Sequence, residues 1–233
     1  MLQTPISGPN RPLHHIIPAA ASADCLATIE ALGTNHRFEA DRPLFLEGDH
    51  ADYCYKTLSG AVRACKLMPD GRRQVTDFFL PGSLIGFDFA TRRGFTAEAI
   101  VESVIRRYPK PSIDRLVDEN TGMAQQLLSL TIDRLASAQK QALVLGCKRA
   151  MERLAGFLFA QAGIQAENRF AGATLTLPMS RLDIADYLGL TVETVSRRFT
   201  KLRHDWIIEL PTAHCVVIRD WDALEDLCAG IAV

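Results

Sequence analysis

The chain has 233 residues, enough for one or two folded domains, and 48% of them are hydrophobic. That share is ordinary for a globular protein with real cores and excludes a wholly disordered chain. The formal net charge is −1. It excludes nucleic-acid binding through overall basicity, so any affinity for DNA has to come from a local basic surface.

The six cysteines form no CxxC or CxxH pair, so the sequence predicts no zinc site. We expect no signal peptide, because the N-terminus lacks a basic segment followed by an apolar one. No apolar run approaches the about 18 residues of a membrane-spanning helix. The simplest placement is the cytoplasm, with reduced thiols and no membrane partner. Residues 1–20 hold four prolines and little apolar periodicity, which predicts a flexible tail.

Residues 21–110 are predicted to form an antiparallel β domain that begins with a short helix at 21–32. Between residues 37 and 109, short β-branched and aromatic runs alternate with glycine turns roughly every ten residues, as in barrels and sandwiches. Pro69-Asp70-Gly71 has the chemistry of a tight turn. It predicts a hairpin between residues 61–67 and 74–79.

Residues 111–145 predict one long helix, with Ser112 and Asp114 suited to its start. Apolar residues along it form two adjacent stripes, and a helix with more than one apolar face needs more than one packing partner. One stripe can cover the β domain, and the other suits the same helix of a second copy. The alternative is a core helix buried within a monomer. We assign these residues to a dimerisation helix: Leu116, Met123, Leu127, Leu128 and Leu135.

Residues 146–233 are predicted to form a winged helix-turn-helix, with Gly146 breaking the long helix as a hinge. An amphipathic helix follows at 148–161 and a strand at 174–177. Two strands at 207–210 and 215–218 form the wing, and a helix at 221–228 closes the domain. The inward residues of the first helix are Met151, Leu154, Ala155, Leu158 and Phe159. The whole chain is thus α+β: an antiparallel β-roll, a long helix and a winged helix-turn-helix.

The segment 180–203, SRLDIADYLGLTVETVSRRFTKLR, is the most informative one. A small residue, a glycine and a β-branched residue stand where a helix-turn-helix needs them: Ala185, Gly189 and Val195. The second helix turns Val195, Phe199 and Leu202 inward and Glu193, Ser196 and Arg197 outward. This arrangement suits a recognition helix in the DNA major groove.

The outward face offers three candidates for reading base pairs. Arg197 can donate two hydrogen bonds to guanine, Glu193 can accept one from cytosine N4, and Ser196 can reach a base edge or a thymine methyl. Glu193 and Arg197 stand one helical turn apart, so they can also hold each other in position. The alternative is that these two residues are merely an exposed ion pair.

Five basic residues and three acidic residues occur in the same segment. Ser180 and Asp183 fit a capping box at the start of the first helix, where free amides are ready to meet phosphates. Our candidates for contacts to DNA phosphates are Ser180, Thr191, Thr194, Arg198 and Lys201. The alternative for these side chains is plain solvation. Arg198 occupies a position that is usually apolar in this motif, so it either reaches a phosphate or alters the local packing.

These motifs resemble the superfamily of the cyclic-AMP receptor protein (CRP) and the fumarate–nitrate reductase regulator (FNR). The resemblance spans nearly the whole chain from about residue 25 and is most specific at residues 84–88 (LIGFD) and 183–197 (DIADYLGLTVETVSR). It is strongest toward the FixK group of bacterial regulators. It implies a homodimeric activator that binds a palindrome with TTGA-type half-sites and recruits RNA polymerase, within an oxygen-responsive gene network. It does not imply an enzyme.

The resemblance also indicates what the chain lacks. The N-terminal region offers only Cys25 for an iron–sulfur cluster, and Arg106 takes the place of the cysteine that the β-roll supplies. Where nucleotide binders have a glutamate and an arginine, this chain has Phe87 and the segment beginning at Phe95. We therefore expect no cofactor and no effector, the alternative being a sensor gated by a cyclic nucleotide or another small molecule. By the same resemblance, the loop 70–77 touches RNA polymerase, the alternative being a solvated turn.

Overall fold

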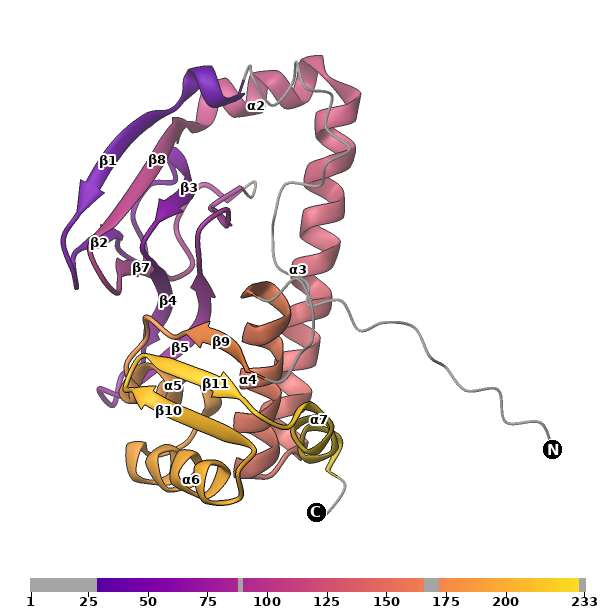
Figure 1. Ribbon diagram of the computed structural model, residues 1–233. Helices are drawn as coiled ribbons and strands as arrows, with labels where there is room; N and C mark the ends of the chain where they lie inside the picture. The colour runs from indigo at the N-terminus through magenta and orange to yellow at the C-terminus, as the bar shows by residue number, and fades with distance from the viewer. Residues whose placement is uncertain (1–28, 88–89, 166–171, 231–233) are drawn as a thin grey trace, which may run out of the picture.

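The computed structural model describes residues 29–87, 90–165 and 172–230 (Figure 1). The predicted tail and most of the predicted helix 21–32 lie outside these ranges. In the described ranges, no helix is both long enough and apolar enough to span a membrane.

Eight strands form two antiparallel four-stranded sheets, in the orders β1-β8-β3-β6 and β2-β7-β4-β5. Their bounds are β1 Thr34–Phe38, β2 Pro43–Phe45, β3 Tyr53–Ser59, β4 Val62–Leu67, β5 Arg73–Phe79, β6 Leu84–Ile85, β7 Thr96–Ala99 and β8 Ser103–Pro109. Apolar residues from both sheets share one buried cluster, so the sheets pack face to face as the predicted β-roll. The predicted hairpin is confirmed: β4 pairs with β5, and Gly71 (φ +84°) supplies the left-handed backbone of its turn.

The long helix is interrupted near its start, so our prediction of one helix at 111–145 is wrong. Two helices occur, α2 (Lys110–Glu119) and α3 (Thr121–Cys147), separated by Asn120 in an extended conformation. The Asn120 side chain accepts a hydrogen bond from the Met123 amide, which is the usual capping role of asparagine. The chain therefore ends one helix and starts another at this residue.

The predicted hinge at Gly146 is also wrong, because α3 continues through Gly146 to Cys147. A glycine inside a helix costs only about 1 kcal/mol relative to alanine, so it need not end the helix. The helix ends at Lys148, whose backbone is extended (ψ 146°). In Figure 1, α3 runs from α2 at one end of the molecule to the helices of the C-terminal region at the other.

The two stripes of α3 have different environments. Met123, Leu127 and Leu130 are buried in a cluster with the β-roll residues Leu84 and Tyr108, and Leu116 packs against the same cluster. Leu116, Met123 and Leu127 thus pack within the chain, which corrects their assignment to a contact with a second copy. The large apolar side chains left exposed on α3 are Leu128 (61%), Ile132 (57%), Leu135 (60%) and Leu143 (64%).

The C-terminal region contains the predicted helices and wing, with shifted bounds. Its elements are α4 Ala150–Gln165, β9 Ala173–Thr176, α5 Arg181–Leu188, α6 Val192–His204, β10 Ile208–Thr212, β11 Cys215–Ile218 and α7 Trp221–Ala229. The strands form one antiparallel sheet in the order β10-β11-β9. Val195, Phe199 and Leu202 are buried, as predicted for the inner face of α6. The region therefore has the architecture of a winged helix-turn-helix.

The β-roll and the C-terminal region share one hydrophobic core. The cluster that holds Leu158, Ile184 and Val195 also contains Val75 and Phe78 of β5. Helix α5 packs directly on β5. The position of the helix-turn-helix is therefore fixed by contacts within the same chain.

Candidate DNA-binding surface

Helix α5 begins with the predicted capping box. The Ser180 hydroxyl accepts a hydrogen bond from the Asp183 amide (3.1 Å), and Asp183 Oδ2 accepts bonds from the Ser180 amide (3.1 Å) and hydroxyl (2.7 Å). These bonds satisfy amides that a helix start leaves unpaired. Ser180 is exposed but already uses its hydroxyl in the cap.

The turn between the two helices follows the predicted chemistry. Gly189 adopts the left-handed conformation (φ +61°) at the end of α5, and Ala185 is buried where the helices cross. Thr191 caps α6, because its hydroxyl accepts a hydrogen bond from the Thr194 amide (3.2 Å). The recognition helix therefore starts at a fixed point relative to α5.

The three base-reading candidates lie together on the exposed face of α6. Glu193, Ser196 and Arg197 are all exposed. Hydrogen bonds from its own backbone amide and from the Thr191 hydroxyl lower the pKa of Glu193. Its carboxylate is therefore ionised at neutral pH and ready to accept a hydrogen bond.

Arg197 is not held by the Glu193 carboxylate. Its Nε donates instead to the backbone oxygen of Glu193, at 3.4 Å. The ion pair that the spacing suggested is absent between these two described side chains. Both charged ends are consequently available to a ligand.

The phosphate candidates differ in how they are engaged. Lys201 forms an ion pair with Asp205 (2.8 Å), so it has to exchange that partner for a phosphate. Thr194 and Thr191 share a hydrogen bond between their hydroxyls (3.1 Å). Arg198 is half-buried, and its Nε has no hydrogen-bond partner among the described residues.

Arg181, which sequence reasoning did not select, lies against the recognition helix. Its guanidinium carbon is 3.4 Å from the centre of the Phe199 ring, and one of its Nη atoms has no hydrogen-bond partner among the described residues. A guanidinium at this distance from an aromatic face gains a cation–π attraction. This contact ties the first residue of α5 to the middle of α6.

Two arginines of the β-roll bind the carboxylates of α5. Arg63, with 10% of its side chain exposed, lies 3.2 Å from Asp183 Oδ1, and it also pairs with Asp41 and Glu98. Arg73 lies 2.7 Å from the same Asp183 oxygen and 2.8 Å from Asp186. Sequence reasoning missed these contacts, because the two arginines are more than a hundred residues from the α5 carboxylates in the sequence.

An aromatic cluster continues the same interface. Phe78 of β5 packs against Tyr187 of α5 and Phe157 of α4, with ring centres 5.2 and 6.2 Å apart. Burial raises the pKa of the neighbouring Asp77 to about 6, although Arg134 and the Phe78 amide oppose this rise. Arg73 and Gln74 face the helix-turn-helix, since both form hydrogen bonds with Asp186. At the exposed tip of the predicted 70–77 loop, Asp70 and Arg72 are bonded to each other.

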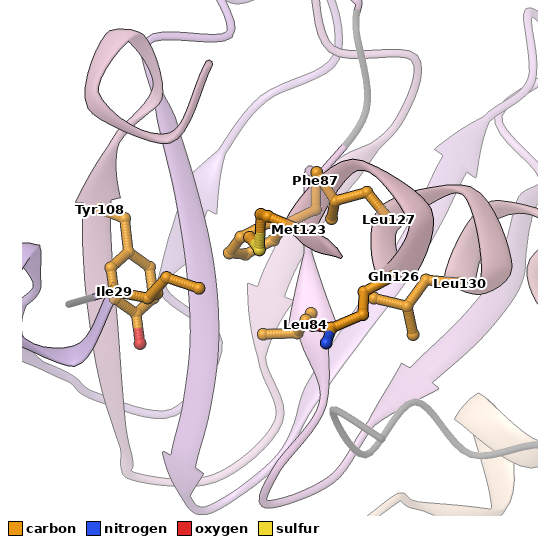
Figure 2. Close-up of a pocket in the computed structure, with 8 residues that line it drawn as sticks. All are labelled: Ile29, Leu84, Phe87, Tyr108, Met123, Gln126, Leu127 and Leu130. Atoms are coloured by element: carbon orange, nitrogen blue, oxygen red, sulfur yellow. The ribbon is translucent and has the colours of Figure 1, made fainter. Parts of the chain in front are cut away.

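A small cavity lies between the β-roll and α3 (Figure 2). Its volume is about 20 Å³, room for about one water molecule. It is lined by Ile29, Leu84, Phe87, Tyr108, Met123, Gln126, Leu127 and Leu130. Elsewhere in the roll, Arg93 is buried, with its guanidinium 4.5 Å from the Phe45 ring centre and bonded to the Tyr53 carbonyl. Its guanidinium is thus directed into the roll core.

Comparison with known proteins places both halves of the chain. The model of the cyclic nucleotide-binding domain matches residues 35–120, and that of the Crp-like helix-turn-helix domain matches residues 152–227. The chain is 40% identical to the nitrogen fixation regulation protein FixK of Rhizobium meliloti over 82% of this chain and 85% of that one. It is 39% identical to the FixK protein of Azorhizobium caulinodans over 91% and 86%.

A solved structure agrees with the sequence relatives. FixK2 from Bradyrhizobium japonicum superposes with a TM-score of 0.80 at 37% identity, covering 84% of this chain and 96% of that one. The relatives are regulators rather than enzymes.

Proposed function

Because the chain belongs to the CRP/FNR family of transcription regulators and has FixK relatives, we propose that it acts as a homodimer on palindromic DNA. The half-sites are of TTGA type. The observation that supports this proposal most directly is the exposed face of α6, where Glu193, Ser196 and Arg197 lie side by side with no ion pair between the two charged side chains. Arg197 reads guanine, Glu193 reads the paired cytosine, and Ser196 contacts the neighbouring thymine.

The proposed dimer contact is the exposed stripe of α3. Leu128, Ile132 and Leu135 follow one another at steps of four and three, the spacing of a coiled-coil seam, and each is more than half exposed. Exposing such a stripe to water is costly. The same stripe of a second copy covers it and places the two recognition helices about one DNA turn apart, roughly 34 Å.

We propose further that the protein binds DNA without an effector. The cavity between the roll and α3 has room for little more than a water molecule, far below the size of a nucleotide site. Arg63, Arg73 and the Phe78 cluster already join the roll to α5. A ligand is therefore not required to bring these parts together.

The proposal has further parts, which the helix-turn-helix geometry and the similarity to FixK proteins support. Residues 21–110 act as a sensor-like roll, α3 acts as the dimerisation helix, and the elements from α4 onward act as the DNA-binding domain. Ser180, Thr191, Thr194, Arg198 and Lys201 contact phosphates. The protein is mainly an activator, contacts RNA polymerase through the exposed tip of the β4–β5 hairpin, and works in an oxygen-responsive network.

One selection experiment tests the central points. Purified, ligand-free protein selects binding sites from random double-stranded DNA in air. We expect a palindrome with TTGA-type arms. A consensus without two-fold symmetry would contradict the homodimer, and arms lacking the guanine–cytosine pair would contradict the roles of Glu193 and Arg197. Binding that requires an added cyclic nucleotide would contradict effector independence.

A further inference from the structure

Arg153 of α4 joins the ends of two other helices. Its Nε donates to the Lys148 carbonyl (2.8 Å), and one Nη donates to the Leu145 carbonyl (2.8 Å). The other Nη donates to the carbonyls of Leu188 (2.9 Å) and Gly189 (3.5 Å). The first two carbonyls belong to the end of α3, and the last two belong to the end of α5.

These acceptors are groups that helices leave unpaired. The last carbonyls of an α-helix have no partner within the helix and carry its partial negative charge. A guanidinium satisfies several of them at once, because its donors lie in a rigid, planar fork. A lysine ammonium is a point charge and cannot serve two separated helix ends in the same way.

Two further contacts join the same ends. Gln141 of α3 donates to the Tyr187 carbonyl in the last turn of α5, at 3.0 Å. A Cβ at Gly189 would lie 3.3 Å from the Leu145 side chain, so the turn of the helix-turn-helix rests closely on α3. The C-terminal end of the proposed dimerisation helix is thus bonded to the turn that precedes the recognition helix.

We propose that Arg153 is a positioning residue that sets the distance between the two half-sites the dimer accepts. This inference rests on the proposed function, since it needs two copies paired along α3. One extra base pair moves a half-site by about 3.4 Å and rotates it by about 35°. A recognition helix bonded firmly to the dimer axis cannot follow that displacement, whereas a loosely attached one can.

The test measures affinity for three duplexes: the selected palindrome, the same palindrome with one base pair inserted at its centre, and the palindrome with the guanine–cytosine pairs exchanged. The proteins are wild type, Arg153→Gln, Arg153→Lys and the control Arg149→Gln. Arg149 is exposed, and the exchange removes the same charge four residues earlier in the chain.

For the wild type, we expect the insertion to weaken binding about 100-fold, comparable to losing specific contacts in one half-site. In Arg153→Gln the insertion penalty falls to about tenfold or less, because charge-assisted bonds to both helix ends are lost. The penalty for exchanged base pairs stays at the wild-type value. Arg153→Lys behaves like Arg153→Gln, and Arg149→Gln behaves like the wild type.

Several results would overturn the inference. If Arg153→Gln keeps the full insertion penalty, or weakens binding to all three duplexes equally, Arg153 has only a structural role. Arg153→Lys keeps the positive charge and most of the aliphatic side chain. If it also keeps the full loss of affinity on insertion, the planar set of guanidinium donors is not required. If the wild type itself shows no insertion penalty, both this inference and the proposed dimer fail. A penalty kept by every variant refutes the inference alone.

Discussion

The β-roll arginines that contact α5 and the arginines of the recognition helix have opposite environments. Arg63 and Arg73 each contact at least two carboxylates and lie mostly away from water. Among the described residues, exposed Arg197 forms a hydrogen bond to a backbone oxygen and no ion pair, and Arg198 has an Nε without a hydrogen-bond partner. Arginines whose guanidinium groups are paired with carboxylates hold one part of the molecule against another. Arginines without carboxylate partners keep their donors for a ligand.

The largest effect is expected from removing Arg63. Arg63→Ala leaves the buried carboxylate of Asp183, only 3% exposed, with one guanidinium fewer beside it. Breaking a buried ion pair from one side typically costs about 3 to 5 kcal/mol of folding free energy. Urea unfolding followed by circular dichroism measures this loss.

The matched control is Arg37→Ala, which breaks the ion pair with Glu102 at the surface of the same roll. Both side chains are more than two thirds exposed, so the expected loss is about 0 to 1 kcal/mol. Equal losses in the two variants would show that burial does not distinguish the interface from the surface.

The next effect concerns Asp77 and pH. Its pKa is about 6 in the folded protein, above the ordinary carboxyl value, so the folded state binds this proton more tightly than the unfolded chain. The stabilising contribution of the protonated group is complete below about pH 4 and is lost as pH rises through 6. Asp77→Asn, which cannot ionise, should therefore gain about 2 kcal/mol over the wild type at pH 8 and little near pH 4. A gain that is the same at both pH values would contradict the buried charge.

Base reading gives a smaller expected change. Glu193→Ala should lower the preference for the guanine–cytosine pair by about 1 to 2 kcal/mol, with folding unchanged, because an exposed carboxylate is removed. Gel shifts on the selected duplex and on its base-exchanged form measure this preference. If the preference is unchanged, Glu193 does not contact a base in the major groove.

The smallest effect is expected at Lys201. Lys201→Ala should weaken binding to all sequences alike and reduce the salt dependence by about one counterion. Its ion pair with Asp205 is at the surface, so unfolding should change by less than about 1 kcal/mol. A selective effect on one base pair would make Lys201 a base reader instead.

Much of the fold was predictable, because its signals are local. The turn at Pro69-Asp70-Gly71, the left-handed Gly189 and the buried stripe of α6 each depend on neighbours within one or two turns of chain. The break at Asn120 was missed, although asparagine is a common cap, because the apolar stripe continues across it. At Gly146 the sequence predicted a break that α3 does not have, since a glycine inside a helix is tolerated when tertiary contacts hold the helix end.

In the candidate site, too, the features set by local sequence were predictable and those set by tertiary contacts were not. The exposure of Glu193, Ser196 and Arg197 follows from helical periodicity, which the sequence displays directly. The contacts of Arg63 with Asp183 and of Arg153 with two helix ends depend on the tertiary arrangement. An arginine that satisfies carbonyls or a distant aspartate has no spacing to reveal it.

The two carboxylate oxygens of Asp183 have different partners. One accepts hydrogen bonds in the capping box of its own helix, and the other accepts hydrogen bonds from Arg63 and Arg73 of the roll. If the C-terminal region were fused to the β-roll of another protein, Asp183 would lose Arg63 and Arg73, the two arginines that pair with it here. We expect a chimera with another family member to fold stably only when its β-roll also carries arginines at the positions of Arg63 and Arg73.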